Sequence, residues 1–221
     1  MRRPPVELLV LDAHGVIFNN PFPTFLKSLA TIRNERPRDL LGRWTKYIRT
    51  PAWTGRLSDS ELWRQLAGER DPDGWRAMLE AMYTHGPAAP HLERWARSVP
   101  IWLLSNHRSG WLLPRLDRFG LTGHFQRVVV SDAVGAAKPD PAIFAPVLQS
   151  SIAPSRVLVV DDHRRNLKTA KRLGFQTVLA GASTTWLGAV DRALSSSREA
   201  PAAVHTSIFS MSMIKQLYWM T

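Results

Sequence analysis

The 221 residues suffice for one sizeable hydrophobic core, or for a core with a small insert. Apolar residues make up 44% of the chain and charged residues 21%, which excludes an intrinsically disordered protein, and the absence of cysteine excludes disulfide frameworks, thiolate zinc sites and cysteine nucleophiles. The formal net charge of +11 favours a small anionic substrate, with non-specific contact to nucleic acid as the less favoured interpretation.

No stretch approaches the ~18 consecutive apolar residues that a membrane-spanning helix requires. The start of the chain, Met1-Arg2-Arg3 followed by apolar residues, imitates a secretory signal. Asp12 and His14 interrupt the apolar stretch, however, and no small-residue cleavage site follows. We therefore expect a cytoplasmic protein without a membrane partner, present as a monomer or a homodimer.

The first predicted element is a short strand that ends at Asp12. Residues 8–11 are all apolar (LLVL), which is typical of a strand buried on both faces in a parallel sheet. Asp12 then stands at the carboxyl end of the strand, where open α/β sheets bind their ligands, and Gly15 ends the run. Taken alone, an aspartate before a loop is more often a turn or capping residue, so the later strand ends must decide between the two interpretations.

Residues 24 to about 86 are predicted to be helical. Apolar side chains recur there at helical spacing, and the sequence SDSE at residues 58–61 is typical of a helix start. No strand-like run interrupts the stretch, so we expect an all-helical insert of three or four helices over residues 20–87. Most of its aromatic side chains are expected in a core. Its tryptophans are Trp44, Trp53, Trp63 and Trp75.

The second half of the chain alternates strands with helices. Strands are predicted at residues 99–104, 128–130, 157–160 and 176–179, and helices at residues 91–97, 108–119, 142–149 and 167–173. This alternation implies right-handed crossovers and an α/β fold, a Rossmann-like parallel sheet with helices on both faces. We expect this core to comprise residues 1–19 and 88–194.

The last part of the chain differs in composition. The triple serine that begins at Ser195, together with Pro201, predicts a linker into a tail over residues 195–221. Residues 208–218 of this tail are apolar and could form a terminal helix or strand. We assign the tail no role.

Polar side chains stand at or just after the ends of the predicted strands. They are Asp12, Ser105, Asn106, Lys138, Asp161 and Asp162. Because the carboxyl ends of parallel strands meet at one edge of a sheet, we expect these groups to lie together. Paired carboxylates can hold a hard cation such as Mg²⁺, an ammonium can hold an anion, and hydroxyl and amide groups can donate to phosphoryl oxygens. The composition predicts phosphoryl transfer with an aspartate nucleophile.

Four short segments resemble, in order, the motifs of the haloacid dehalogenase-like superfamily. They are residues 9–16 (LVLDAHGV), 103–106 (LLSN), 138–144 (KPDPAIF) and 160–166 (VDDHRRN). Each falls at the end of a predicted strand or in the loop after it, which makes the set far more specific than any single motif. The helical insert between the first two motifs resembles the family's helical cap, which closes over the site and excludes water.

The resemblance implies a metal site. Asp12 matches the nucleophile and first metal ligand, and His14 matches the residue whose backbone carbonyl binds the metal. Asp162 matches the direct ligand of relatives that carry paired acids, with Asp161 supporting the site through water or hydrogen bonds. The implied cofactor is Mg²⁺.

The resemblance also implies a phosphate site. Ser105 and Lys138 match the groups that hold the phosphate. We expect the neighbouring Asn106 to donate a hydrogen bond to a phosphoryl oxygen.

His14 departs from the family's phosphatase pattern. Phosphatases of the family carry aspartate at this position, where it protonates the leaving group and then activates water. An imidazole, with an ordinary pKa near ~6.5, can serve as acid and base, so we assign His14 that role. The dehalogenase branch carries tyrosine here and uses no metal, so the Asp161-Asp162 pair disfavours that branch.

Three functions are consistent with these residues. The first is a Mg²⁺-dependent hydrolase, a phosphatase that acts on a small phosphorylated metabolite through an aspartyl-phosphate on Asp12. The second is a protein that keeps the fold and the metal site but has lost turnover and serves as a binding or regulatory module. The third is a family member with other chemistry, dehalogenase-like or biosynthetic.

The remaining histidines and basic residues carry no predicted chemistry. His107, His124 and His163 are expected to be surface or loop residues. The five basic residues within 164–172 are expected to form a solvated helix face rather than a nucleic-acid site. The arginines of the insert are expected to face solvent, with some chance that one of them reaches the substrate. They include Arg33, Arg36, Arg43 and Arg49.

Overall fold

A five-stranded parallel sheet forms the centre of the protein. In the computed structural model, which describes residues 4–68 and 72–198, the strand order is β3-β2-β1-β4-β5 and every neighbouring pair is parallel. The strands are β1 Leu8–Leu11, β2 Ile101–Ser105, β3 Arg127–Val130, β4 Val157–Asp161 and β5 Gln176–Leu179. The predicted strands are thereby confirmed. The apolar run of β1 occupies the central position, and every residue of β1 and of its neighbours β2 and β4 is buried, as expected for internal strands of a parallel sheet.

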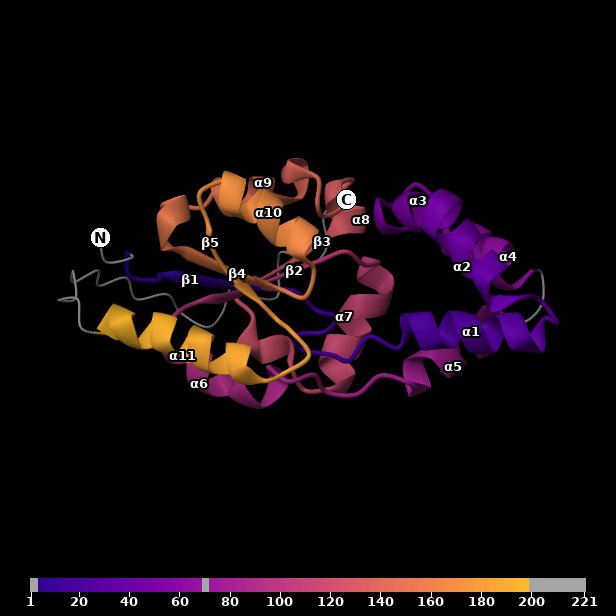
Figure 1. Ribbon diagram of the computed structural model, residues 1–221, viewed down its shortest axis with the longest axis horizontal. Helices are drawn as coiled ribbons and strands as arrows, with labels where there is room; N and C mark the ends of the chain where they lie inside the picture. The colour runs from indigo at the N-terminus through magenta and orange to yellow at the C-terminus, as the bar shows by residue number, and fades with distance from the viewer. Residues whose placement is uncertain (1–3, 69–71, 199–221) are drawn as a thin grey trace, which may run out of the picture.

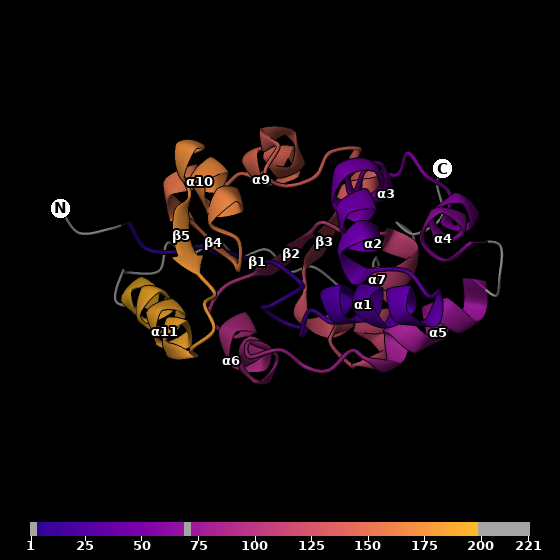
Figure 2. The ribbon, with the colours of Figure 1, turned by 45° about the vertical axis from the view of Figure 1, so that its right-hand side comes forward.

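Helices cover both faces of the sheet (Figure 1), which confirms the predicted α/β fold. Leu8 and Val10 pack into the cluster of α9 (Ala145–Leu148) and α10 (Arg164–Arg172). Leu9 and Leu11 pack into the cluster of α6 (Leu92–Ala96) and α11 (Thr185–Arg198). The alternation follows from the two-residue period of a strand. Figure 2 shows α9 and α10 on one side of the sheet and α6 and α11 on the other.

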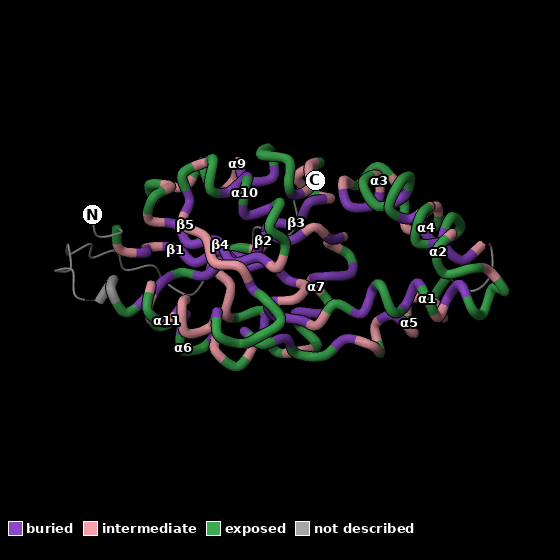
Figure 3. The backbone as a smooth tube through the Cα atoms, in the orientation of Figure 1, coloured by how far each residue is buried: buried purple, intermediate pink, exposed green. Residues whose placement is uncertain are grey.

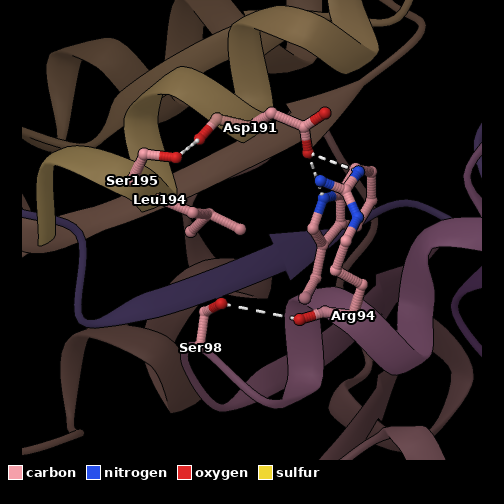
Figure 4. Close-up of a pocket in the computed structure, with 6 residues that line it drawn as sticks. Arg94, Ser98, Asp191, Leu194 and Ser195 are labelled. Atoms are coloured by element: carbon pink, nitrogen blue, oxygen red, sulfur yellow. Dashed lines mark hydrogen bonds and ion pairs between the residues drawn. The ribbon is translucent and has the colours of Figure 1, made fainter. Parts of the chain in front are cut away.

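A clasp of polar side chains joins α6 to α11 beside a cavity of about 70 Å³ (Figure 4). One carboxylate oxygen, Asp191 Oδ1, accepts a hydrogen bond from Trp95 Nε1 at 2.7 Å and pairs with Arg94 Nη2 at 2.7 Å. Burial raises the pKa of Asp191, but these two contacts outweigh it and leave the pKa below its usual range. The clasp fixes two helices on the face of the sheet opposite α10.

The helical segment, residues 20–87, lies beyond the carboxyl ends of the strands, at the opposite end of the molecule from α11 (Figures 1 and 2). Its elements are α1 Phe22–Ile32, α2 Pro37–Arg43, a π-helical turn Trp44–Ile48, α3 Arg49–Trp53, α4 Asp59–Ala67 and α5 Pro72–Ala81. Because α2, the π turn and α3 follow one another without a break, they count as one continuous helix. Together with α1, α4 and α5 this gives four helices in the described part of the segment, in agreement with the prediction. Ser58 caps α4 in a complete capping box with Glu61.

The aromatic stripes of the helical segment are internal, as predicted. Trp44, Trp53 and Trp63 are buried and Trp75 is half-buried. Figure 3 shows the same pattern along the backbone, with buried stretches facing inward and exposed stretches on the outer side of the helices.

Two segments, residues 17–19 and 82–86, connect the helical segment to the sheet, and hydrogen bonds join them to each other. Asn19 Nδ2 donates to Met82 O at 3.0 Å, and Asn19 Oδ1 accepts from Thr84 N at 2.8 Å. The amide N of Gly86 donates to Ile17 O at 2.8 Å, which extends the pairing toward the sheet. The two segments that connect the helical segment to the sheet are therefore hydrogen-bonded to each other.

A second joint lies after β2, where α7 (Ser109–Arg118) begins. Arg108 Nη1 donates to Leu57 O at 2.9 Å and Ala52 O at 3.3 Å, and Arg108 Nε lies 2.6 Å from Asp59 Oδ1. Trp111 Nε1 also donates to Asp59 Oδ2 at 2.8 Å, so Arg108 and Trp111 together anchor the helical segment to the sheet domain at this joint. No helix of the described residues is long and apolar enough to cross a membrane.

The structure corrects three local predictions. Residues 142–149 are a 3₁₀ turn, Pro141–Phe144, followed by α9, because Pro146 lacks the N–H that would continue regular α-helical bonding. The predicted loop after β3 begins with a short helix, α8 Ser131–Val134. The linker predicted at Ser195 is wrong at its start: α11 continues to Arg198, since an apolar stripe of this helix packs against the sheet. The prediction for residues 208–218 lies outside the described residues.

Candidate functional site

Lys138 is the hub of the polar cluster at the carboxyl ends of the strands. Its Nζ lies 2.9 Å from Asp12 Oδ1 and 2.7 Å from Asp161 Oδ2, and it donates to Leu104 O at 2.7 Å. The Lys138 side chain is only 2% exposed. Three strand ends, those of β1, β2 and β4, are therefore tied together by one buried ammonium.

Asp161 lies behind the site rather than in it. Its Oδ1 accepts hydrogen bonds from His163 N at 2.7 Å and from Asn166 Nδ2 at 2.9 Å, and its Oδ2 is held by Lys138. With both oxygens occupied and no exposed surface, Asp161 is suited to hold Lys138 and the start of α10 in place. The neighbouring Asp162 lines the open cavity instead.

Gly15 lets Asp162 approach the first strand's loop. This glycine has φ +71°, and a Cβ built on it would lie 2.6 Å from Asp162 Oδ2. A side chain at position 15 would therefore both strain the backbone and push the carboxylate away. The glycine that was predicted only to end the apolar run also makes room for a candidate metal ligand.

Asn106 and Ser105 differ in their surroundings. Asn106 lines the cavity, and its amide brackets the backbone of Lys138, accepting from Lys138 N at 2.7 Å and donating to Lys138 O at 2.8 Å. Ser105 does not line the cavity, and its buried Oγ has no hydrogen-bond partner among the described residues. A buried hydroxyl without a partner is costly, and a bound polar group would satisfy it.

The charges of the cluster do not balance within the protein. Burial raises the pKa of Asp12 from 3.8 to about 7; Lys138 opposes this rise, and the carboxylates of Asp161 and Asp162 add to it. Burial also lowers the pKa of Lys138, but the attraction of Asp12 and Asp161 outweighs it and leaves the pKa raised. Three carboxylates thus face one ammonium. A hard divalent cation with oxygen ligands fits this excess of negative charge.

His163 extends the acidic cluster toward solvent. It is exposed, as predicted, and its Nδ1 bonds Asp162 Oδ1. This hydrogen bond raises the pKa of His163 above its usual value, against a smaller effect of burial. Ligand atoms of Asp161, Asp162 and His163 lie within 4.8 Å of one another, close enough to share a metal ion.

His14 lines the cavity beside Asp12, but its ring is already engaged. Its Nε2 lies 2.8 Å from the hydroxyl of Tyr83, and the two rings stack with centroids 5.6 Å apart. Burial, together with the positive charges of Arg115, Lys138 and His163, lowers the pKa of His14 from 6.5 to about 3. At neutral pH the imidazole is therefore uncharged, which the assumption of an ordinary pKa did not anticipate.

A buried network that the sequence did not reveal stands behind His14. The carbon at the centre of the Arg115 guanidinium lies 3.4 Å from the ring centroid of Tyr83. Arg115 Nε donates to Glu80 Oε2 at 3.0 Å, and Arg115 Nη1 lies 2.9 Å from His107 Nε2. Since the Arg115 side chain has no exposed surface, these contacts take the place of water around its charge.

Of the two alternatives predicted for His107, surface or loop, the loop is confirmed: the residue lies between β2 and α7 but is buried. It is 1% exposed, and its ring centroid lies 5.0 Å from that of His14 and 5.4 Å from that of Trp53. Its backbone N donates to Ser131 Oγ at 2.9 Å, which draws the chain after β2 inward. Burial, with the neighbouring charges of His14 and Arg115, lowers the pKa of His107 well below its usual value. His124, by contrast, is half-buried in a 3₁₀ turn away from the site.

The cavity above the cluster has a volume of about 770 Å³. One wall comes from the sheet domain, with Asp12, Asn106 and Asp162. The other comes from the helical segment, with Trp44 and Trp53. The volume is in the range of small-molecule sites. Further lining residues from the helical segment are Asn20, Phe22, Pro23, Leu41, Thr45, Arg49, Thr50, Thr54 and Arg56.

Comparison with known proteins agrees with this geometry. The family model of haloacid dehalogenase-like hydrolases matches residues 77–174. A solved structure of a HAD family enzyme from Bacteroides thetaiotaomicron, in complex with magnesium and inorganic phosphate, is similar with a TM-score of 0.67 at 19% identity, over 79% of this chain and 93% of that one. Over residues 77–174 the chain matches the haloacid dehalogenase-like hydrolases, and its fold is similar to theirs. The matched residues include the last three of the four motifs.

Curated relatives within the haloacid dehalogenase-like superfamily include phosphatases. The pyrimidine 5′-nucleotidase YjjG of Escherichia coli is 37% identical over 97 residues, which are 43% of this chain and 40% of that protein. The phosphoserine phosphatase of Thermus thermophilus is 28% identical over 169 residues, which are 68% of this chain and 63% of that protein. The chain thus spans less than two thirds of the length of either relative.

Proposed function

We propose that the protein is a Mg²⁺-dependent phosphatase that hydrolyses a small phosphoric monoester, with Asp12 as the nucleophile. The observation that carries the proposal is the position of Asp12, which lines the cavity together with Asp162 and is held there by Lys138. The similarity to phosphatases and to a magnesium- and phosphate-bound structure supports the same reading. Residues 1–19 and 88–194 would form the core domain, and residues 20–87 the cap.

The two oxygens of Asp12 have different surroundings. Oδ1 accepts a hydrogen bond from Ala13 N at 2.7 Å and lies 2.9 Å from Lys138 Nζ, whereas Oδ2 accepts none from the described residues. We assign Oδ2 the attack on phosphorus. A new Asp12–phosphorus bond forms as the bond from phosphorus to the ester oxygen breaks, and the departing oxygen takes its proton from water. A second water then releases inorganic phosphate and restores the carboxylate.

Asp12, Asp162 and the backbone carbonyl of His14 would hold Mg²⁺, with Asp161 acting through water. When bound, the ion neutralises charge on the phosphoryl oxygens and keeps the carboxylates ionised. Lys138 and Ser105 would hold the phosphoryl group, and the buried, unpartnered Oγ of Ser105 supports that assignment.

His14 is proposed to act as the base of the second step. Its uncharged imidazole can accept a proton from the attacking water, whereas a pKa of about 3 leaves almost no imidazolium to protonate a leaving group. Tyr83 fixes Nε2, so Nδ1 is the nitrogen left for water. We expect Tyr83→Phe to lower kcat about three- to tenfold with KM unchanged, since it removes only the hydrogen bond that orients the ring.

The low pKa of His14 also favours a second candidate function, a binding module that keeps the metal and phosphate sites without turnover. The decisive experiment measures phosphate release from a panel of phosphate esters with Mg²⁺, for the native protein, Asp12→Asn and the exposed control Asp117→Asn. We expect release by the native protein and the control only. Equal release by native protein and Asp12→Asn would refute the phosphatase proposal, and calorimetric binding of Mg²⁺ and phosphate without turnover would establish the binding module.

His14→Asp separates the two functions further. If His14 limits a working phosphatase, this variant should raise kcat, because aspartate can serve as both acid and base at this position. An inert native protein whose His14→Asp variant is equally inert would agree with the binding module.

A further inference from the structure

The cavity is lined by arginines that lack carboxylate partners. Arg49 and Arg56 of the helical segment and Arg165 of α10 line it, and none of the three has an ion pair with a carboxylate of the described residues. Two other arginines of the helical segment lie near carboxylates. Arg43 pairs with Glu35 and Arg76 lies 3.8 Å from Asp59.

Local structure presents Arg49 and Arg56 to the cavity. The π-helical turn ends where Arg49 N donates to Trp44 O, and both residues line the cavity. Arg56 Nε donates to Thr54 Oγ1 at 3.0 Å, and Thr54 Oγ1 in turn donates to Thr50 O at 2.8 Å. This chain of bonds uses Nε and leaves the terminal nitrogens of Arg56 for a ligand. π-helical turns occur often at functional sites.

A continuous row of rings runs from the candidate reaction site into the helical segment. Ring centroids are 5.0 Å apart from His14 to His107, 5.4 Å from His107 to Trp53, 5.3 Å from Trp53 to Trp44, and 4.6 Å from Trp44 to Phe22. Trp44, Trp53 and Phe22 also line the cavity. The body of a ligand that starts at Asp12 and enters the cavity would therefore meet an apolar, aromatic surface.

Charged groups line both walls of the cavity. The sheet domain contributes the carboxylates of Asp12 and Asp162 together with Lys138 and Arg165, whereas the helical segment contributes Arg49 and Arg56. A second anionic group on a ligand would be repelled by the carboxylates and attracted by the two guanidinium groups, which bind carboxylate and phosphate oxygens through paired N–H donors.

We propose that Arg49 and Arg56 form an anion-binding subsite, and that the substrate is a phosphoric monoester with an apolar middle and a second anionic group. This inference rests on the proposed phosphatase function, which it narrows to one class of substrate. The subsite holds the second anion, a carboxylate or a second phosphate, while the aromatic row contacts the part between the two charged ends.

The test uses a series of ω-carboxyalkyl phosphates of increasing chain length, each matched with its uncharged methyl ester. We expect the native protein to prefer the carboxylate at one chain length by about tenfold or more in kcat/KM, mainly through KM. The double variant R49Q/R56Q should lose that preference, so that its kcat/KM for the carboxylate and for the methyl ester becomes similar. Arg64→Gln, which removes an exposed charge from α4 outside the cavity, is the matched control and should keep the preference.

Binding measurements separate failure of the subsite from failure of the phosphatase. Isothermal titration of the same compounds is carried out with Asp12→Asn and with Asp12→Asn carrying R49Q/R56Q. Turnover without any preference for the carboxylate, or a preference that survives in R49Q/R56Q, would overturn the subsite and leave the phosphatase standing. Preferential binding without turnover by the native protein would leave the subsite standing and overturn the phosphatase. Absence of both binding and turnover would overturn both.

Discussion

Asp12 should make the metal-free protein less stable as the pH rises. Burial, reinforced by Asp161 and Asp162 and opposed by Lys138, raises the pKa of Asp12 from 3.8 to about 7. Between these two values the folded state binds more protons than the unfolded state, so the free energy of unfolding falls with rising pH. From pH 5 to pH 8 the contribution of Asp12 is about 2 to 3 kcal/mol, since each unit of pKa difference corresponds to about 1.4 kcal/mol.

Urea denaturation in EDTA at pH 5 and pH 8 measures this contribution. The native protein should lose about 2 to 3 kcal/mol more than Asp12→Asn over this interval, and Asp117→Asn should behave like the native protein. His14 has the opposite sign, because its lowered pKa adds stability as the pH rises toward 6.5, but both proteins carry His14 and the difference between them removes it. Mg²⁺ should then stabilise the native protein more at pH 8 than at pH 5. Equal pH dependence in native protein and Asp12→Asn would refute the reasoning.

Two further substitutions test single contacts. Gly15→Ala forces a side chain at φ +71° to within 2.6 Å of Asp162 Oδ2, so Mg²⁺ affinity measured by calorimetry should fall about tenfold, whereas Gly110→Ala, which has open space around it, should leave the affinity unchanged. Glu80→Ala leaves the fully buried Arg115 without its carboxylate, so urea denaturation should show a loss of about 3 kcal/mol. A loss below about 1 kcal/mol would mean that water replaces the carboxylate of Glu80 at little cost.

The arrangement of the strand ends was predictable from the chain. The apolar run before Asp12 sets where β1 ends, and the parallel order of the sheet places Asp161 and the loop of Lys138 at the same edge. The sequence pattern could not predict which of the two acids, Asp161 or Asp162, faces the cavity. Asp161 is the last residue of β4 and is buried, whereas Asp162 follows the strand and lines the cavity, and only the packed structure shows which of the two faces the open side.

The environment of His14 was not predictable for a different reason. Tyr83 lies 69 residues from His14, and Arg115 lies 35 residues from Glu80, so no local spacing signals either contact. Tyr83 belongs to an apolar helical stripe in sequence, and a stripe of that kind indicates only burial. His107 likewise follows a strand like many loop residues, and its inward position depends on the aromatic side chains that surround it.

The paired connecting segments at Asn19 limit how the helical segment can move against the sheet. Because Asn19 bonds both Met82 and Thr84, the two connecting segments must bend together. The helical segment would therefore rotate against the sheet about one hinge. At the second joint the helical segment is held by Arg108, whose contact with Asp59 opposes this rotation. Residence time of a bound ligand and rate of entry would both depend on the contacts at this joint, which also include hydrogen bonds of 2.8 Å from Trp111 Nε1 to Asp59 Oδ2 and from Arg76 Nη2 to Gly110 O.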